Sequence, residues 1–245
     1  MNDERTHLDL RGAAALITGG SRGLGAALAA ELAARGARVA LVARGESALE
    51  ETARRITEAG GVAYAIPADV ADKSAPHRIA AIAADLVGPI DLLVHAASTL
   101  GPVPMPTLAD TPCEALADVL ETNVIGPFRL TKIVAGSMAL RGRGVVVHVS
   151  SDAAVEPYPR WGAYGASKAA HDHLQRVWAA ELAGRGVTFL SVDPGEMDTA
   201  MHAAALPDAD RSALARPEDV ARRVVERLGA RALASGARFS AAEAP

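Results

Sequence analysis

Short apolar runs alternate along the chain with longer segments in which apolar residues recur every three or four positions. Short runs are typical of buried strands, and longer periodic segments are typical of amphipathic helices. The pattern predicts strands at 13–18, 38–43, 62–66, 92–95, 144–149 and 187–192, and helices at 24–35, 47–59, 74–87, 112–140 and 164–183. Gly36, Gly60 and Gly184 directly follow three of these helices, where glycine commonly ends a helix.

The alternation of strands with helices indicates an α/β fold, a doubly wound parallel sheet with helices on both faces. In such sheets the crossovers are right-handed and ligands bind at the carboxyl ends of the strands. Residues that directly follow predicted strands should therefore meet at one rim of the sheet. They include the glycine-rich loop after the first strand, Asp69, Val70, the segment 95–98, Ser151, Pro194 and Gly195.

Length and charge narrow the class of protein. The chain has 245 residues and a formal net charge of −4, which suit a single enzyme domain over residues 1–245 and provide no basic surface for nucleic acid. One cysteine, Cys113, excludes a disulfide within the chain and fits a reducing compartment. Because the sequence shows neither a signal peptide nor a long apolar run, we expect a cytoplasmic protein that does not enter a membrane.

A glycine-rich loop joins the first predicted strand to the first predicted helix. Glycines permit a tight turn and a close approach of backbone N–H groups to a diphosphate, and the helix N-terminus favours negative charge. The unit therefore indicates a dinucleotide site, although its spacing differs from the common G-x-G-x-x-G pattern and a glycine loop by itself is often only a turn. The loop residues are Gly19, Gly20, Ser21, Arg22, Gly23, Leu24 and Gly25.

Tyr164 and Lys168 lie four residues apart in a predicted helix, so their side chains share one face. A nearby ammonium favours phenolate, and we expect Lys168 to move the pKa of Tyr164 down from about 10 toward the neutral range. Ser151, at the end of a predicted strand, could donate a hydrogen bond to the same substrate oxygen. Taken alone, a Tyr–Lys pair at this spacing is more often an ordinary surface pair than a catalytic one.

These motifs together resemble the short-chain dehydrogenase/reductase family, and the resemblance covers most of residues 11–200. It implies a Rossmann-like fold in which Ser151, Tyr164 and Lys168 form the catalytic set. Asn123 matches the family asparagine that holds a water in the proton relay between the lysine and solvent.

The resemblance also implies where the cofactor lies. Asp69 and Val70 match the pair that meets the adenine, and Pro194, Gly195 and Thr199 match the segment around the nicotinamide. We expect the remaining contacts from the glycine-rich loop, from Ala96 in the segment 95–98, and from Tyr164 and Lys168 themselves.

Two segments depart from the family pattern. Where the family usually has Asn-Asn-Ala-Gly, this chain has His95-Ala-Ala-Ser98, so Ser98 adds a side chain beside the expected cofactor path. We expect His95 to be a structural histidine that replaces the lost hydrogen bonds, with a substrate or acid/base role as the alternative. Residues 201–245 are expected to supply substrate-side helices and a divergent C-terminus, in which 235–240 resembles the start of the last family strand.

Other conspicuous side chains carry less chemistry. His171 and His173 lie two residues apart on a helix, so they face different sides and lack metal-ligand spacing; we expect solvent or interface positions and no metal site. Tyr158 and Trp161 precede Tyr164 in a predicted loop, where stacking on a substrate and packing against another subunit remain equal alternatives.

The end of the second predicted strand indicates NADP(H) as the cofactor. Enzymes selective for NAD usually place Asp or Glu there to bind the adenosine ribose, and this position is Ala43. Arg44 follows it, and Arg22 and Ser21 lie in the glycine-rich loop. Two guanidinium groups and a hydroxyl could therefore surround a 2′-phosphate, because the planar guanidinium fork suits phosphate.

The sequence therefore predicts an NADP(H)-dependent oxidoreductase that moves hydride between the nicotinamide and a carbonyl or secondary alcohol substrate. The alternatives are an NAD-linked alcohol dehydrogenase and a non-catalytic nucleotide-sensing protein with the same fold. Segments 112–140 and 164–183 carry more apolar surface than one sheet contact needs, so we also expect a homodimer or homotetramer.

Overall fold

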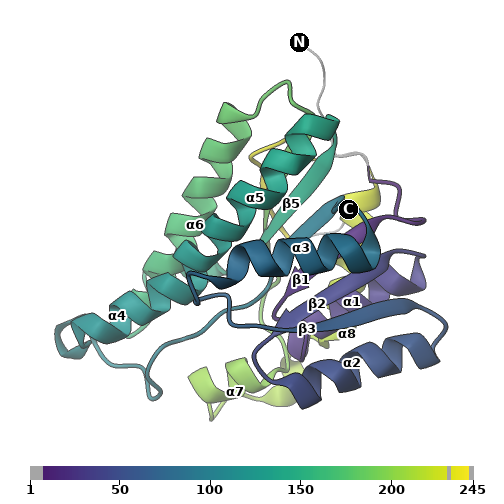
Figure 1. The fold of residues 1–245 in the computed structure, drawn as a ribbon. Coiled ribbons are helices and arrows are strands. Elements are labelled where there is room, and N and C mark those ends of the chain that lie inside the picture. The colour runs from purple at the N-terminus through teal and green to yellow at the C-terminus, as the bar shows by residue number, and fades with distance from the viewer. Residues whose placement is uncertain (1–7, 231–232, 243–245) are drawn as a thin grey trace.

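A computed structural model describes residues 8–230 and 233–242 of the chain. Within these residues, seven parallel strands form one sheet in the order β3-β2-β1-β4-β5-β6-β7 (Figure 1). The strands are β1 Ala14–Thr18, β2 Arg38–Ala43, β3 Val62–Pro67, β4 Leu92–His95, β5 Gly144–Val149, β6 Val187–Asp193 and β7 Arg238–Ser240. The first six match the predicted strands to within one residue at either end, and the doubly wound fold is confirmed.

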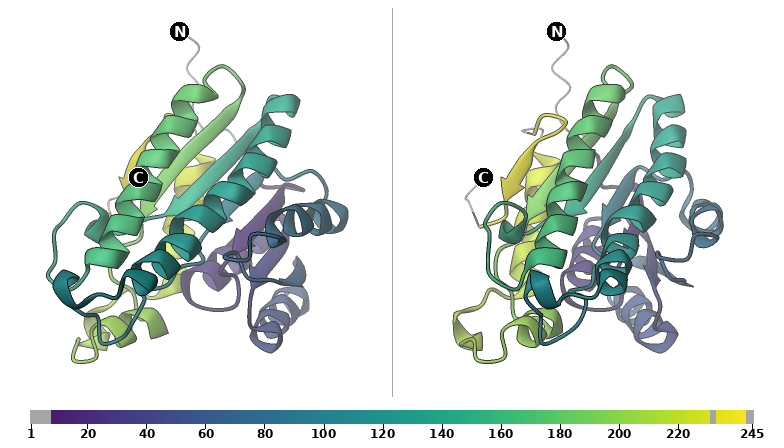
Figure 2. Two further views of the ribbon diagram at one scale, coloured as in Figure 1. Left: turned by 60° about the vertical axis from the view of Figure 1, so that its left-hand side comes forward. Right: turned by 90° about the vertical axis from the view of Figure 1, so that its left-hand side faces the viewer.

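Helices cover both faces of the sheet, as Figure 2 shows from two further directions. They are α1 Gly23–Ala34, α2 Glu46–Glu58, α3 Ala75–Val87, α4 Cys113–Leu120, α5 Gly126–Arg141, α6 Gly162–Glu181, α7 Ala200–Ala205 and α8 Pro217–Gly229. Adjacent residues of a strand point to opposite faces. Accordingly, Ile17 packs in the core formed with α1, α2 and α8, while Leu16 packs in the core formed with α3, α5 and part of α6.

The strand order reverses between β1 and β4, because the chain crosses from β3 to the other side of β1. At such a switch point the loops that follow neighbouring strands diverge and leave room for a ligand. The loops after β1, β4 and β5 therefore define the region in which a site is expected.

The helix predicted over 112–140 is present without a gap from Cys113 to Arg141, but it is not α-helical throughout. The segment forms α4, a π-helical turn at Glu121–Ile125 and α5. Pro127 lies in the first turn of α5 and lacks the N–H that an uninterrupted α-helix would use. A Cβ on Gly126 would lie 2.3 Å from the Val70 carbonyl oxygen, so glycine allows α5 to start against the loop after β3.

The C-terminal segment is more regular than the sequence indicated. Helix α8 is amphipathic and packs on α1, with Val220, Val224 and Leu228 buried in the core. The short helix α7 follows the 194–199 segment at the end of β6, and β7 confirms the expected last strand. None of the helices in the described part of the chain combines the length and the apolar character that a membrane crossing requires.

Candidate active site

The glycine-rich loop lies against the ends of β2 and β4. A Cβ on Gly19 would lie 2.6 Å from the Ala97 nitrogen and 2.8 Å from the Ala96 carbonyl oxygen, and Gly19 has a φ of +74°. A Cβ on Gly25 would lie 2.2 Å from the Gly19 carbonyl oxygen. Glycine is therefore required at both positions, because a side chain there would clash with the neighbouring backbone.

The loop is also tied to the segment predicted to select the cofactor. The Gly19 and Gly20 amides donate to the Val42 carbonyl at 2.8 and 3.2 Å. Ser21 accepts through its carbonyl a hydrogen bond from Thr52 of α2 at 3.2 Å. These bonds bring the loop that carries Ser21 and Arg22 to the end of β2, where Arg44 begins the next turn.

Arg22 and Arg44 are both exposed at this rim. Arg44 Nη1 lies 4.0 Å from Asp69 Oδ2, an exposed contact that contributes little stability. Asp69 also accepts a hydrogen bond from the Ala71 amide at 2.9 Å, and Val70 is buried beneath it. The predicted adenosine-binding residues therefore share one edge of the sheet.

Tyr164, Lys168 and Ser151 come together where α6 passes the end of β5. Tyr164 and Lys168 are 8% and 2% exposed. The Lys168 ammonium donates to the Val149 carbonyl at 2.7 Å and lies 5.4 Å from the centre of the Tyr164 ring. A Cβ on Gly165 would lie 2.6 Å from the Ala153 carbonyl oxygen, so Gly165 allows α6 to approach the turn that carries Ser151.

The expected low pKa of Tyr164 is wrong for the protein without a cofactor. Burial raises the pKa of Tyr164 to about 12, a hydrogen bond with the Ser151 side chain opposes the rise, and the charges of Asp152 and Asp193 add to it. Burial lowers the pKa of Lys168 to about 8, against the opposing charge of Asp172. The ammonium bonds to a backbone carbonyl beside the phenyl ring, so it does not offset the desolvation of the phenol.

Ser151 is held by its neighbours rather than free. Its hydroxyl donates to Asp152 Oδ1 at 2.9 Å and accepts from the Ala153 amide at 3.2 Å, which caps a short 3₁₀ turn. Asp152 also accepts a hydrogen bond from Tyr158 Oη at 2.9 Å. Asp152 was not predicted as a site residue, although an acidic residue directly after Ser151 was a visible signal.

Asn123 joins three parts of the site from within the π-helical turn. Its side chain accepts from the Thr99 amide and donates to the Thr99 carbonyl, both at 2.9 Å, and also donates to Ser167 Oγ at 2.9 Å. The Asn123 carbonyl contacts His171 Nδ1 at 3.0 Å. Asn123 is thus fixed to the loop after β4 and to α6.

The residues predicted to surround the nicotinamide lie near the glycine-rich loop. A Cβ on Gly23 would be 3.5 Å from the Thr199 methyl group. The Thr199 hydroxyl accepts a hydrogen bond from the His202 amide at 3.2 Å and caps α7. Gly195 follows Pro194 with a φ of +72°, and its amide donates to Asp193 at 3.1 Å.

The arrangement of these residues fits a dinucleotide. Ser98 Oγ is buried and has no hydrogen-bond partner among the described residues, so it can accept or donate one bond to a bound molecule.

A small apolar cluster surrounds the phenol of the site. It consists of Leu100, Met105, Ala153 and Tyr164, with Trp161 packed against it. The Trp161 and Tyr164 rings meet edge to face with centroids 5.7 Å apart. The cluster gives the region around the phenol an apolar wall.

Three histidines lie together in the core behind the candidate site, with His148 stacked on His171, and the expected exposed position of His171 is wrong. His95, His148 and His171 are buried, with ring centroids 5.5 Å apart for His95 and His171 and 3.6 Å apart for His148 and His171. His95 Nε2 bonds Thr131 Oγ1 at 2.8 Å, which confirms a structural bond, but His95 Nδ1 has no partner among the described residues. Neither ring nitrogen of His148 has one.

Comparison with known proteins places this geometry in context. The short chain dehydrogenase family model matches residues 13–210. A short chain dehydrogenase of Pseudocercospora fijiensis is 37% identical over 204 residues, which cover 82% of this chain and 64% of that protein. A ketoacyl reductase of Nostoc is 34% identical over 221 residues, covering 89% of this chain and 76% of that protein.

A solved structure of an actinorhodin polyketide ketoreductase with NADPH superimposes with a TM-score of 0.86. It is 29% identical, and the match covers 96% of this chain and 97% of that one. The similarity therefore extends well beyond the motifs to nearly the whole fold.

The histidine stack predicts a specific loss of stability in acid. Burial lowers the pKa of His95 to about 3, and burial lowers the pKa values of His148 and His171 well below their usual value. An unfolded histidine has a pKa near 6.5, so below that pH the unfolded chain binds protons that the folded chain excludes. The free energy of unfolding should therefore fall with decreasing pH by up to about 1.4 kcal/mol per pH unit for each buried histidine.

Urea unfolding at pH 7 and pH 5 tests this expectation. In His95→Asn the difference between the two pH values should shrink by about 2 kcal/mol relative to wild type. His173→Asn, at an exposed position of the same helix as His171, is the control and should leave the difference unchanged. An equal difference in wild type and His95→Asn would contradict the expectation.

Proposed function

We propose a function for this chain on the basis that it belongs to the short-chain dehydrogenase/reductase family, a family of oxidoreductases. The proposed reaction is hydride transfer between NADP(H) and a carbonyl or secondary alcohol. The observation that carries the proposal is the convergence of Ser151, the buried Tyr164 and the buried Lys168 beside a glycine-rich loop.

The cofactor, when bound, supplies the hydride. The glycine-rich loop would hold its diphosphate through backbone N–H groups at the start of α1. Gly195, Thr199 and Ser98 would border the nicotinamide, because Thr199 lies close to Gly23 and Ser98 offers an unpaired hydroxyl. Ala96 would lie beside the cofactor, since its carbonyl packs against Gly19.

Tyr164 is the proposed proton donor in carbonyl reduction. Its pKa of about 12 keeps the phenol protonated at neutral pH, which suits an acid. Ser151, within hydrogen-bond reach of that phenol, would orient the substrate oxygen at the Tyr164 Oη. In the direction of alcohol oxidation the same phenol must first lose its proton, so that direction should be favoured at high pH.

Lys168 and Asn123 support proton movement at this position. With its pKa lowered to about 8, Lys168 remains largely protonated at pH 7 yet can exchange its proton more readily than an exposed lysine. The Asn123 carbonyl and side chain fix the loop after β4 against α6, the helix that carries Lys168. The groups of the proposed proton relay therefore keep their positions relative to one another. We assign to Lys168 a second role, the binding of the nicotinamide ribose.

The preference for NADPH is supported by charge at the end of β2. Ala43 leaves no carboxylate to repel a 2′-phosphate, and the exposed Arg44 and Arg22 lie on loops joined through the Val42 carbonyl. Guanidinium groups bind phosphate through two charge-assisted hydrogen bonds. The ketoreductase with NADPH described above is in keeping with this choice.

We also propose that the protein assembles through α5 and α6. Figure 2 shows both helices on the same face of the sheet. Phe128, Leu140 and Val177 on these helices, with the adjacent Ile125, are exposed apolar side chains. Such a surface favours a homodimer or a homotetramer.

A panel of carbonyl compounds with NADPH, followed by absorbance of the reduced cofactor, tests the reaction. Tyr164→Phe removes only the transferable proton, so kcat should fall by about a hundredfold to ten-thousandfold while cofactor binding persists. Lys168→Ala should lower kcat and also weaken cofactor binding. Tyr64→Phe, on strand β3 far along the sheet from α6, is the matched control and should behave as wild type. Near-normal turnover in Tyr164→Phe would refute the proposed acid; cofactor binding without turnover in wild type would favour the nucleotide-sensing alternative.

Cofactor preference is tested by exchanging the charges at the end of β2. Wild type should show a higher kcat/KM with NADPH than with NADH. Ala43→Asp combined with Arg44→Gln adds a repulsive carboxylate and removes a phosphate ligand, so the ratio should shift toward NADH by about tenfold or more. Arg54→Gln, an exposed change on α2, is the control. A wild-type enzyme that already prefers NADH would identify the NAD-linked alternative.

Light scattering at micromolar concentration measures the assembly. A mass of two or four chains is expected. Phe128→Glu should reduce that mass, because it buries a charge in the proposed contact. A monomeric wild-type protein would refute the assembly.

A further inference from the structure

Arg238 reaches from the last strand to the candidate active site. It is the first residue of β7, and its guanidinium makes three bonds to three different segments. Nε donates to Asp172 Oδ2 of α6 at 3.2 Å, and Nη2 donates to Asp193 Oδ2 at the end of β6 at 3.0 Å. Nη2 also donates to the Ser151 carbonyl at 2.9 Å, although the two residues are 87 positions apart.

Each segment that Arg238 holds carries part of the site. Asp172 lies one helical turn after Lys168, and Ser150 Oγ donates to its Oδ2 at 2.7 Å. Asp193 directly precedes the 194–199 segment. The third contact is the backbone of Ser151 itself. One guanidinium therefore fixes α6, the end of β6 and the turn after β5 relative to one another.

The two carboxylates depend on this guanidinium. The side chains of Asp172 and Asp193 are only 10% and 14% exposed. Asp172 Oδ1 has no hydrogen-bond partner among the described residues, and the neutral His148 ring lies 3.8 Å from it. Removal of Arg238 would leave two largely buried negative charges without their shared partner.

We propose that Arg238 is a positioning residue for the reaction: by binding Asp172, Asp193 and the Ser151 carbonyl together, it fixes the turn that carries the substrate-orienting hydroxyl. The inference rests on the proposed oxidoreductase function. It assigns to the divergent C-terminal strand a part in the chemistry, in addition to completing the sheet.

The charged groups around the site give the proposal an electrostatic consequence. Asp152 and Asp193 face Tyr164 and raise its pKa, and Asp172 raises the pKa of Lys168 against burial. Arg238 offsets Asp172 and Asp193. Without it, Asp193 would act on Tyr164 at full strength, so the pKa of Tyr164 should rise further, and Asp172 would act at full strength on Lys168.

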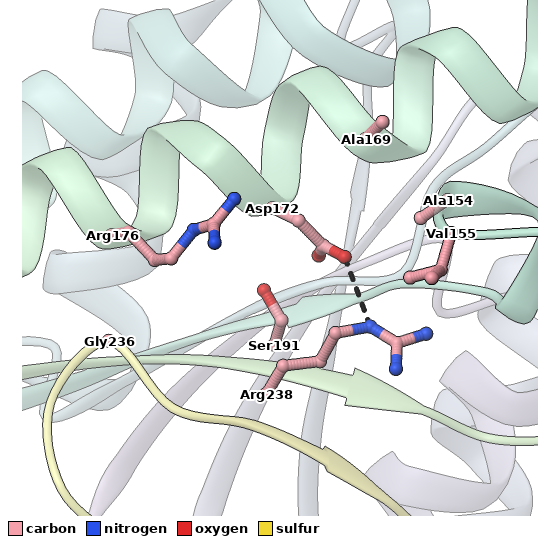
Figure 3. A pocket seen from close by; sticks show the side chains of 8 residues that line it. All are labelled: Ala154, Val155, Ala169, Asp172, Arg176, Ser191, Gly236 and Arg238. Atoms are coloured by element: carbon pink, nitrogen blue, oxygen red, sulfur yellow. Dashed lines mark hydrogen bonds and ion pairs between the residues drawn. The ribbon is translucent and has the colours of Figure 1, made fainter.

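A small cavity beside Arg238 makes the proposal testable by chemical rescue. It has a volume of about 160 Å³, and its lining includes Arg176 as well as Asp172 and Arg238, which are joined by an ion pair (Figure 3). The Arg238 side chain is 33% exposed, so solvent reaches the guanidinium. Truncation of the side chain would enlarge this cavity, and free guanidinium ion could then occupy the space between Asp172 and Asp193.

The experiment compares Arg238→Ala, Arg238→Lys and a control, Arg223→Ala. Arg223 also binds the C-terminal segment, through a bond from its Nε to the Ala241 carbonyl at 2.7 Å, but it lies on α8 and not on β7. We expect Arg238→Ala to lower kcat by roughly tenfold to a hundredfold, with unchanged cofactor affinity. Millimolar guanidinium chloride should restore part of that loss in Arg238→Ala and in neither wild type nor the control.

Two further readouts separate positioning from folding. The pH profile for alcohol oxidation should move to higher pH in Arg238→Ala and return toward wild type with guanidinium. Arg238→Lys keeps a charge but cannot make all three bonds, so it should show an intermediate kcat; it also serves if Arg238→Ala fails to fold. If the wild-type enzyme is active and both Arg238→Lys and Arg238→Ala keep its kcat and its pH profile, the inference about Arg238 is overturned while the proposed function stands. A wild-type protein inactive on every carbonyl would overturn the proposed function, and the inference with it.

Discussion

The burial of the Lys168 ammonium is the constraint on which the site depends. A charge that is 2% exposed must be compensated locally, because desolvation of an unpaired ion costs several kcal/mol. The chain provides one direct bond, to the Val149 carbonyl, and a carboxylate one turn away, Asp172. Both are products of the fold: β5 must end where α6 passes, and Gly165 must let the helix approach. The geometry of sheet and helix therefore sets the protonation of the residue that is expected to move protons.

Neutral rings and an ion pair make up the surroundings of that charge. Lys168 also acts electrostatically on three histidines, which burial keeps uncharged and which therefore add no second positive charge to the region. Asp172 acts on Lys168 directly and is itself paired with the Arg238 guanidinium. A cationic histidine at any of these positions would raise the cost of burying the lysine. The neutral stack and the ion pair are thus two parts of one arrangement, and neither can be altered without changing the electrostatic environment of the other.

The sequence predicted what depends on local patterns and missed what depends on contacts between distant segments. Strands β1 to β6 were visible because a sheet buried on both faces needs continuous apolar runs, and the glycine-rich loop was visible because steric limits at Gly19 and Gly25 admit no other residue. The π-helical turn between α4 and α5 was missed because it depends on the approach of Val70 to Gly126. His171 was predicted to be exposed, which is wrong, because a spacing of two residues shows only that His171 and His173 face different sides of the helix. It does not show which of the two faces the core. Arg238 gave no signal, since its partners lie on three other segments.

The pKa of Tyr164 was predicted to shift in the wrong direction because it depends on distant groups as well as on local ones. Spacing along the helix correctly placed Lys168 near the ring, but the direction of a pKa shift is decided by all charges and by water, not by one neighbour. Here burial and two carboxylates outweigh the Ser151 hydrogen bond. A protonated phenol in the free protein is still coherent with an acid role, because a donor must hold its proton until the substrate oxygen develops charge. Any molecule that brings positive charge beside Tyr164, or that draws Lys168 away from the Val149 carbonyl toward the phenol, would lower that pKa, so binding and acid strength are coupled through the position of a single ammonium group.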